Sequence, residues 1–497
     1  MSVVLAVDLG GTGLRAGLFD AEGAEVATAH RPLAFVEDPT GRSEQDPALW
    51  WEALGEAVDL LAQDRPAGLG DVAAVALCGF TRTQVFLDRR GRVLRPAIAF
   101  RDSRALGPAE TALAIPEVAG HPDARHLNGF HPLARLLWLK HNEPAAWSAT
   151  ALVLEPKDYL NFRLSGIARS DCISSAWLTA ALRGAKPTLG AAAGIDRDVL
   201  PVIGAPTDRV GPVADGLLGA LADLAGVPVF CGSNDTWTAV AGLGALKPGC
   251  AYGISGSSEV FGLMTGSAGE ADGLITISWG EDLWQIGGPG QNGANVLAWI
   301  VDRLDRRDLP VAERLDSLLA TPASRRPLLF FPYLNGERTP FWDRDLRAAF
   351  LGITGSHQDG DLVRAVMEGV AFVNRIVLER AERAAGHLAD EVRLAGGGGR
   401  NAVWNQIRAD VLGRRVRVSR AKEMGLAGAV AVARVGLGEA SDFDAAAEAA
   451  EAGFTDYLPD PARRRRYDQV YSVFRDVHAA VETGSHRLAE IGRTPPG

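Results

Sequence analysis

The chain has 497 residues, of which 47% are hydrophobic, and its formal net charge at pH 7 is −10. A chain of this length outgrows a single hydrophobic core and predicts two or more domains, and its acidic balance argues against a nucleic acid as the main partner. The four dispersed cysteines form no CxxC pair, which argues against a zinc site or a disulfide framework. No apolar run is long enough to span a membrane and no basic signal-peptide segment opens the chain, so we expect a soluble, cytoplasmic protein without a membrane partner.

The first thirty or so residues predict an antiparallel meander. The run VVLAV ends at Asp8 and is followed by the turn LGGTG, the segment LRAGLFD, the turn DAEG and the segment AEVATAH. Short β-branched or apolar runs separated by turn residues are typical of consecutive strands. A dinucleotide-binding glycine loop would open a helix, whereas this one opens a strand, so the pattern disfavours a Rossmann domain.

Helices and strands then alternate up to about residue 230. Asp46 and Pro47 predict the start of an amphipathic helix. VAAVALCGF is typical of a buried strand. Residues 84–100 predict a hairpin, and residues 129–164 predict two amphipathic helices.

Asp235 lies in CGSNDTWTAV, where an apolar, strand-like segment gives way to a predicted helix rich in Ala and Gly. Two interpretations stay open at this point. As a helix cap the carboxylate would be worth about 1 kcal/mol, and in a cleft it could take a proton from a substrate hydroxyl. Asp8, which follows the first strand, has a similar alternative: it either stabilises its turn or contributes to a metal site.

The second half of the chain repeats the layout of the first. GCAYGISGSSEVFGLMT again predicts a strand, a small-residue turn and a strand, and VRLAGGGGRNAVWNQIRADVLGRRV predicts a strand, a four-glycine turn and a helix. This repetition indicates an internal duplication into two similar domains. We expect them at residues 1–247 and 248–480, with a disordered tail at 481–497.

Three small-residue turns, each after a predicted strand, can present backbone N–H groups to anionic oxygens: Gly10–Gly13, Ser255–Ser258 and Gly396–Gly399. The GxxxxGK[ST] pattern of a P-loop is absent from the sequence. Each turn alone is typical of an ordinary tight turn, but three of them with two strand-end carboxylates favour a nucleotide site. Arg15 belongs either beside the phosphates or on the solvent face of its strand.

These features suit phosphoryl transfer, which depends on positioning and electrostatics. Mg²⁺ bridges phosphate oxygens in such sites, and an acceptor group orients the attacking hydroxyl. Asp8 suits the metal shell, and Asp235 suits the general base.

At this point the chain resembles the FGGY family of carbohydrate kinases, and most closely the family's xylulokinase branch, over about residues 3–475. The resemblance rests on a series of motifs in the family's order: AVDLGGTGLRAGLFD, FHPLARLLWLKHNEP, LEPKDYLNFRLSG, CGSNDTWTAVAGLGALKPG, FPYLNGERTPFWDRDLRAAFLGI, DLVRAVMEGVAF and LAGGGGRNAVWNQIRADVLGRRV. It implies an α/β fold of two actin-like ATPase (ribonuclease H-like) domains flanking a catalytic cleft, with ATP and Mg²⁺ as cofactors and a small sugar as substrate.

The resemblance also implies roles for residues of this chain. Asp235 would be the catalytic base and, together with Asp8, a metal ligand. Phosphate binding would fall to Gly10, Gly11, Thr12, Gly13, Arg15, Ser255, Gly256 and Ser257. The adenosine would contact Gly397, Gly398 and Asn401, and the sugar would contact Thr81, Arg82, Asp102, Asp235 and Thr236. A homodimer is one assembly compatible with this prediction.

The largest departure from the family pattern is CGFTRTQ, residues 78–84. Xylulokinases typically carry a Gln-Met-His-Gly or Gln-Gln-His-Gly run where this chain has Phe80, Thr81, Arg82 and Thr83. Arginine offers several fixed donors and a permanent charge, unlike histidine. We therefore expect the acceptor's hydroxyl pattern to differ from that of D-xylulose, unless Arg82 turns away and pairs with an acid such as Asp102.

Smaller departures affect the phosphate and helical segments. Gly11 replaces the family's usual threonine, although Thr12 follows, and Ser255-Gly256-Ser257 replaces the usual Gly-Thr-Ser. The usual lysine of the middle signature is Arg135, and Thr236 replaces an asparagine.

The predicted function is an ATP-dependent sugar kinase acting on the terminal hydroxyl of a ketopentose, with D-xylulose as first choice. Ribulose, L-xylulose and polyols such as erythritol or glycerol are alternatives. A remote alternative is an actin-like ATPase without sugar kinase activity, and a sugar-sensing regulator on the same fold is another.

Overall fold

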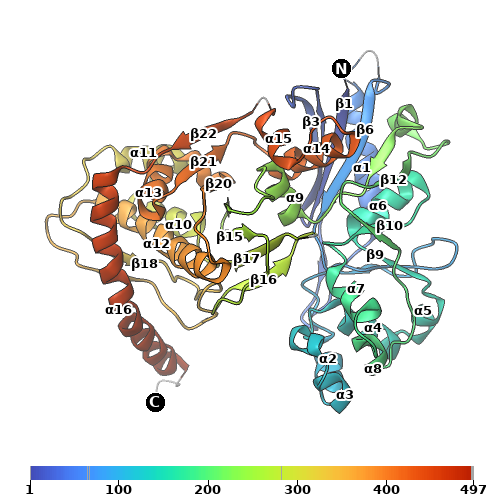
Figure 1. Cartoon of the computed structure of the whole chain (residues 1–497), viewed down its shortest axis with the longest axis horizontal. Coiled ribbons are helices and arrows are strands. Elements are labelled where there is room, and N and C mark those ends of the chain that lie inside the picture. Colours follow the sequence, from blue (N-terminus) through green and yellow to red (C-terminus); the bar gives the residue numbers. More distant parts are fainter. Residues whose placement is uncertain (1, 64, 66–67, 281, 451, 494–497) are drawn as a thin grey trace. The chain divides into compact units, whose positions relative to one another are not determined.

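The computed structural model describes residues 2–63, 65, 68–280, 282–450 and 452–493. Two compact units make up the chain (Figure 1). The first unit contains Met1–Gly242 and Glu423–Glu451, and the second contains Leu243–Lys422 and Ala452–Gly497.

The first unit is built on a six-stranded sheet of order β12-β13-β6-β1-β2-β3. Its first three strands form the predicted antiparallel meander: β1 (Val3–Gly10), β2 (Gly13–Phe19) and β3 (Glu25–Pro32). Two further strands run parallel to β1 and complete the centre of the sheet: β6 (Val72–Gly79) and β13 (Pro228–Phe230). β1 and β6 are buried along almost their whole length, as expected for strands covered on both faces.

The second unit repeats this arrangement in a seven-stranded sheet of order β16-β17-β15-β14-β20-β21-β22. Three strands again form an antiparallel meander: β14 (Cys250–Ser255), β15 (Glu259–Thr265) and β17 (Trp284–Pro289). Two others run parallel to β14: β20 (Glu391–Ala395) and β21 (Arg415–Ser419). The duplication predicted from the two glycine- and serine-rich turns therefore corresponds to two sheets with the same central strand order.

Helices pack on both sheets (Figure 1). In the first unit they are α1 (Pro47–Gln63), α9 (Asp235–Gly242) and α14 (Met424–Leu437). In the second unit they are α12 (Asp359–Ala385) and α13 (Ala402–Leu412). Asp46 lies at the start of α1 as predicted, and its carboxylate accepts a hydrogen bond from the backbone N–H of Ala48 at 2.9 Å.

The remaining elements are short. Those of the first unit are β4 (Val36–Glu37), β5 (Ser43–Gln45), β7 (Val85–Leu87), β8 (Ala97–Ile98), α2 (Leu106–Leu113), α3 (Pro116–Ala119), η1 (Pro122–His126), α4 (Pro132–Asn142), α5 (Pro144–Ala149), β9 (Leu152–Leu154), α6 (Pro156–Ser165), β10 (Arg169–Asp171), α7 (Ala176–Arg183), α8 (Leu189–Ala192), β11 (Val202–Gly204), β12 (Arg209–Pro212), η2 (Gly219–Leu224) and α15 (Phe443–Glu448). Those of the second unit are β16 (Ile275–Ser278), α10 (Ala294–Leu304), α11 (Val311–Leu319), β18 (Leu329–Phe331), β19 (Ala349–Leu351), η3 (Gly397–Arg400) and β22 (Phe454–Tyr457). None of the helices in the described part of the chain is both long and apolar enough to cross a membrane.

The division of the chain differs from the predicted boundary at 247/248. Residues 423–451 belong to the first unit although they follow most of the second unit in sequence. The reason is the close packing of α14 on α9, where a Cβ on Gly428 would stand 1.8 Å from the carbonyl oxygen of Thr238. Only a glycine permits this approach, and a sequence pattern along α14 does not show which helix it packs against.

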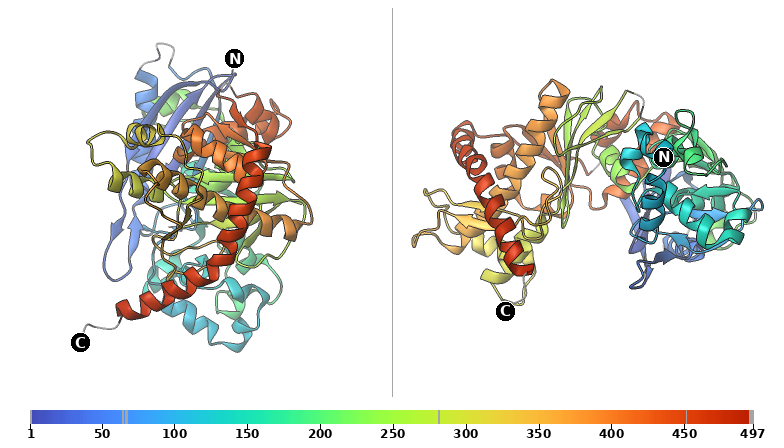
Figure 2. Two further views of the ribbon diagram at one scale, coloured as in Figure 1. Left: turned by 90° about the vertical axis from the view of Figure 1, so that its left-hand side faces the viewer. Right: turned by 90° about the horizontal axis from the view of Figure 1, so that it is seen from below.

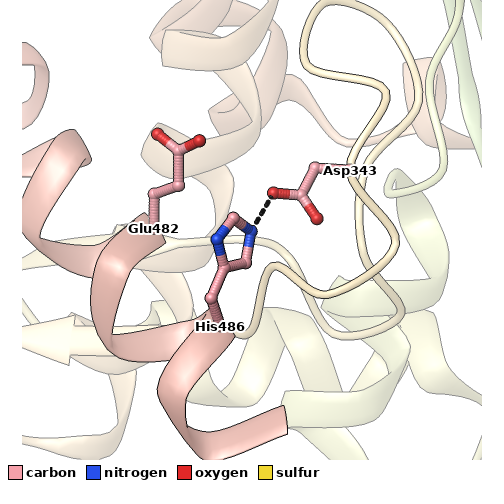
Figure 3. Close-up of side chains that lie close together, drawn as sticks. All are labelled: Asp343, Glu482 and His486. Carbon is pink, nitrogen blue, oxygen red and sulfur yellow. Dashed lines mark hydrogen bonds and ion pairs between the residues drawn. The ribbon is translucent and has the colours of Figure 1, made fainter. Parts of the chain in front are cut away.

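The prediction of disorder at residues 481–497 is wrong for residues 481–493. They form the last part of the long helix α16 (Pro461–Arg493), which Figure 2 shows near the C-terminus. The loop at residues 343–347 holds this part of the helix. Ser485 Oγ accepts a hydrogen bond from the backbone N–H of Arg347 at 3.0 Å, and Asp343 Oδ2 lies 2.5 Å from His486 Nε2 (Figure 3). Arg493 forms an ion pair with Asp345 at 2.5 Å. Residues 494–497 lie outside the described residues.

Candidate active site

The two predicted carboxylates lie on strand ends of the first unit. Asp8 is near the end of β1, where it faces Arg15 in the antiparallel pair and Cys78 in the parallel pair. Asp235 is the first residue of α9 and follows the turn at residues 231–234 that comes after β13. An isolated bridge between Gly79 and Asn234 ties the end of β6 to the turn before Asp235. Carboxyl ends of adjacent parallel strands are the usual place for a ligand site in α/β sheets.

Asp235 is not the cap of α9. Asn234 takes that role, since its Oδ1 accepts a hydrogen bond from the backbone N–H of Trp237 at 2.9 Å. Asp235 Oδ1 accepts from the adjacent residue, Thr236, through the backbone N–H at 2.7 Å and through Oγ1 at 3.2 Å. Because Asp235 is also exposed, its carboxylate can meet a small molecule.

Electrostatics link the two acids. Burial raises the pKa of Asp8 to about 6, and the negative charge of Asp235 contributes to this rise. The protein groups packed around Asp235 displace water and raise its pKa although part of its surface is exposed, while hydrogen bonds from Thr236 and the charge of Arg82 oppose the rise. A raised pKa makes a carboxylate a better proton acceptor near neutral pH. Mg²⁺ prefers oxygen ligands, and a bound cation would offset the repulsion between the two carboxylates. Asp8 and Asp235 therefore fit the predicted metal.

Gly425, in the first turn of α14, is a site residue that the sequence did not reveal. A Cβ on this residue would stand 2.3 Å from Asp8 Oδ2 and 2.6 Å from Asp8 Cγ. The carboxylate of Asp8 therefore rests directly on the backbone of Gly425. Cys78 Sγ lies 3.5 Å from the carbonyl oxygen of the same glycine. β1 and β6 therefore both contact the start of α14.

The predicted phosphate turn Gly10–Gly13 is a two-residue hairpin turn, with Gly10 paired to Gly13 and with Gly11 and Thr12 at its tip. Thr12 is exposed. Arg15 forms a long ion pair with Glu423, at 3.7 Å, and both side chains are 42% exposed. Such a pair contributes little to stability, so the guanidinium remains free to bind an anion.

Arg82 has a backbone conformation that side chains rarely adopt, with φ of 56°. A buried arginine holds it there. Arg135 Nη1 donates to the carbonyl oxygen of Arg82 at 2.6 Å, and Nη2 donates to that of Phe100 at 3.1 Å. Strained backbone of this kind persists where the surroundings enforce it and is concentrated at functional sites. The exposed Arg82 guanidinium lies 6.0 Å from the ring centroid of Trp177.

Asp102 does not pair with Arg82. Its side chain is 1% exposed, and both oxygens accept hydrogen bonds from Arg104, with a further one from the backbone N–H of Ser43 at 2.9 Å. This arrangement argues against the predicted contact between Asp102 and a sugar, because its acceptor positions are already occupied.

Glu155 lies under the same loop. Its Oε2 accepts from the backbone N–H of Thr83 at 3.2 Å and lies 3.4 Å from Thr81 Oγ1. Burial raises the pKa of Glu155 to about 8. The predicted sugar contact Thr81 is half-buried, whereas Arg82 is exposed. Of the two, Arg82 offers the more accessible donors.

A buried ion cluster supports the turn that carries Asp235. Lys157 forms ion pairs with Asp158 and, at 2.8 Å, with Asp171. Lys157 Nζ also donates to the carbonyl oxygen of Cys231 at 3.3 Å, and Ser233 Oγ donates to Asp171 at 2.8 Å. These residues position the turn before Asp235. Lys157 and Asp158 lie in LEPKDYLNFRLSG, one of the segments that resemble the FGGY family, but the sequence alone does not connect them to this turn.

In the second unit, the residues of the turn after β14 differ in how exposed they are. Ser255 is fully buried, and its Oγ lies 2.5 Å from Glu259 Oε1 and 2.7 Å from Arg408 Nη2. The predicted use of the Ser255 hydroxyl for a phosphate is therefore not favoured. Gly256 is half-buried and Ser257 is exposed, so Ser257 supplies the accessible hydroxyl of this turn.

The glycine turn after β20 lies directly against Ser255. A Cβ on Gly398 would stand 2.1 Å from Ser255 Oγ, whereas a Cβ on Gly397 would meet nothing within 4 Å. Gly397 is exposed and Gly398 is buried, so Gly397 is the better placed for a nucleotide. Asn401 caps α13, since its side chain accepts from the backbone N–H of Trp404 at 2.9 Å. The two predicted turns of this unit are thus neighbours at the ends of adjacent parallel strands.

A different cluster has the geometry of a possible three-ligand metal site. One possible ligand atom from each of Asp343, Glu482 and His486 lies within 4.8 Å of the other two (Figure 3). The bond from His486 to Asp343 raises the pKa of the histidine. This ion pair explains the cluster as a contact between α16 and its neighbouring loop.

The chain matches known proteins over most of its length. The N-terminal domain model of the FGGY family of carbohydrate kinases matches residues 3–242, and the C-terminal domain model matches residues 251–437. The chain is 29% identical to the xylulose kinase of Escherichia coli K12 over 440 residues, 87% of this chain and 89% of that protein. The crystal structure of the xylulose kinase from Rhodospirillum rubrum is 28% identical, with a TM-score of 0.80 over 97% of this chain and 100% of that one.

A gluconate kinase from Lactobacillus acidophilus shares the fold, with a TM-score of 0.81 and 23% identity over 98% of this chain and 100% of that one. Kinases named for different acceptors thus have the same architecture, so the fold alone does not identify the acceptor. The matches to both domain models nevertheless cover most of the chain. This protein belongs to the FGGY family of carbohydrate kinases and is a sugar phosphotransferase.

Proposed function

We propose that this protein transfers the γ-phosphate of ATP to the terminal hydroxyl of a ketopentose, with D-xylulose as the first acceptor to test. The proposal rests mainly on the position of Asp235. Its side chain is accessible, Asn234 rather than Asp235 caps α9, and its charge interacts with Asp8. The names of relatives at 28–29% identity support the choice of acceptor.

In the proposed reaction Asp235 accepts the proton of the attacking hydroxyl as the hydroxyl oxygen bonds to the γ-phosphorus of ATP. The bond from that phosphorus to the β-phosphate oxygen breaks, and ADP leaves. The raised pKa of Asp235 brings this group closer to the working pH. The charge of Arg82 opposes that rise in pKa. Asp8 and Asp235 would hold Mg²⁺, which when bound would supply positive charge to offset the negative charge of the phosphates.

The residues proposed to bind ATP lie mainly in the second unit. The backbone at Gly256, Ser257 and Gly397 offers small, accessible residues where a polyphosphate and a nucleoside can approach closely. The proposal requires that a nucleotide bound there reaches an acceptor bound on the first unit.

The acceptor assignment is open to a direct test because Arg82 stands where xylulokinases typically carry histidine. ADP release should be measured with the purified full-length protein, ATP and Mg²⁺ over a panel of D-xylulose, L-xylulose, D-ribulose, gluconate, erythritol and glycerol. The proposal expects the highest kcat/KM with D-xylulose. A higher value with another member would move the assignment to that acceptor. ATP turnover unaffected by any of these acceptors would instead support an actin-like ATPase.

A further inference from the structure

The second unit contains a small cavity whose polar lining is incomplete. Its volume is about 10 Å³, which has room for one water-sized species. Phe261, Pro332 and valines of α12 form its apolar side. The polar lining residues are Glu259, Asn292, Glu337, Thr339 and Asn374, and each is at most 4% exposed.

Four atoms of this lining have no hydrogen-bond partner among the described residues: Glu259 Oε2, Asn292 Oδ1, Thr339 Oγ1 and Asn374 Nδ2. A buried polar atom without a partner costs about 1–3 kcal/mol. Four such atoms around one cavity are therefore expected to share a ligand.

Neighbouring hydrogen bonds show which polar atoms of the lining are left without a partner. Asn292 Nδ2 donates to the carbonyl oxygen of Gly336 and to Glu337 Oε2, both at 2.8 Å, so the amide must present its oxygen elsewhere. Glu259 Oε1 accepts from Arg408 at 2.9 Å and Ser255 at 2.5 Å, which leaves Oε2 unpaired. With the hydroxyl of Thr339, three oxygen ligands remain, and the amide of Asn374 can add a fourth by a half-turn about its last bond.

The charge of the lining favours a cation. The guanidinium of Arg408 neutralises Glu259, but Glu337 is a second carboxylate on the same cavity. Glu337 accepts three hydrogen bonds, from the backbone N–H groups of Gln291 and Arg338 and from Asn292. Oxygen ligands around a buried negative charge suit a hard cation. Mg²⁺ keeps several of its water molecules and would not fit.

We propose that this cavity binds one monovalent cation, of the size of sodium or potassium, through Glu259 Oε2, Asn292 Oδ1 and Thr339 Oγ1. Because Glu259 also bonds Ser255 at the turn after β14, the ion would stabilise a turn predicted to contact phosphate. The ion-binding claim itself does not depend on the proposed kinase activity.

The test uses the full-length protein without nucleotide. Its melting temperature is measured while choline chloride is replaced by NaCl, KCl or RbCl at constant ionic strength. We expect a saturable rise with at least one alkali cation, since a ligand that binds only the folded state stabilises it. In crystals grown with rubidium or thallium(I), we expect an anomalous peak in the cavity. The same melting temperature in all four salts, together with only a water molecule in the cavity, would overturn the proposal.

Thr339→Val removes one oxygen ligand with little change in shape, and should raise the half-saturating cation concentration severalfold. Thr238→Val is the matched control, because Thr238 is also fully buried with an unpartnered hydroxyl but lies in the first unit. Its cation dependence should equal that of the wild type. Asn374→Leu, which replaces an amide of the lining by an apolar side chain, provides a second variant should Thr339→Val not fold, and should also raise the half-saturating cation concentration. An unchanged response in the folded variants would contradict the assigned ligands.

Discussion

Asp8 rests on Gly425 so closely that a methyl group on the glycine would stand 2.3 Å from the Asp8 carboxylate oxygen. Gly425→Ala should therefore displace Asp8 or shift the start of α14. We expect kcat to fall by at least tenfold, about 1.4 kcal/mol of transition-state free energy, measured by steady-state kinetics. Gly55→Ala in α1 is the control, because a Cβ there would meet nothing within 4 Å. Equal kcat in both variants would show that the position of Asp8 is unimportant.

Arg82 is expected to act on the acceptor and on the ionisation of Asp235. Arg82→Asn removes the charge while an asparagine still tolerates the positive φ of 56°. The KM for the sugar should rise and that for ATP should change little. The acidic limb of the kcat/KM profile should also move to higher pH, because the Arg82 charge lowers the pKa of Asp235. Arg90→Asn, at an exposed turn, should move neither parameter.

Glu155 should make stability depend on pH. Its folded pKa of about 8 lies above its ordinary value of 4.5, so the folded state binds more protons than the unfolded state between these values. Stability contributed by this group is therefore present below pH 4.5 and is lost as the pH rises toward 8. Glu155→Gln should melt higher than the wild type by a margin that grows from pH 5.5 to 8 in thermal scans.

The exposed Glu52→Gln variant is the control for this pH dependence. Its difference from the wild type should stay constant over the same range. A constant difference for Glu155→Gln as well would contradict the elevated pKa.

The buried pair of Lys157 and Asp171 should matter more than a surface pair. Asp171→Asn leaves the buried ammonium partly uncompensated and should lower stability by about 3–5 kcal/mol. Asp198→Asn breaks the pair with Arg183, in which Asp198 is 50% exposed, and should cost about 0–1 kcal/mol. Denaturant titrations followed separately by probes in each unit would measure both. Similar losses would show that the ion cluster does not support the turn before Asp235.

The sequence predicted those features that local patterns determine. The β1–β3 meander follows from short apolar runs separated by turn residues, and the glycine turns after β14 and β20 follow from composition. Asp235 was found because an isolated acid between a strand and a helix is chemically distinctive. Its neighbour Asn234 is an equally good cap by residue type, and only the structure shows that it is the one that caps.

Long-range packing explains what the sequence could not predict. Gly425 contacts Asp8 only because α14 returns to the first unit, which no local pattern reveals. The inward turn of the Ser255 hydroxyl depends on Glu259 and Arg408. The end of α16 is polar, and its order depends on bonds to the loop at residues 343–347.

The central claim is that an aspartate at the start of α9 receives the proton of the attacking hydroxyl. Asp235→Asn keeps an oxygen acceptor for the backbone N–H of Thr236 but removes the negative charge. Turnover with the preferred acceptor should fall about 10²–10⁴-fold, while the Kd for ATP measured by calorimetry should stay within a factor of about three, roughly 0.65 kcal/mol. Turnover close to the wild-type value in a folded, ATP-binding Asp235→Asn protein would contradict the account.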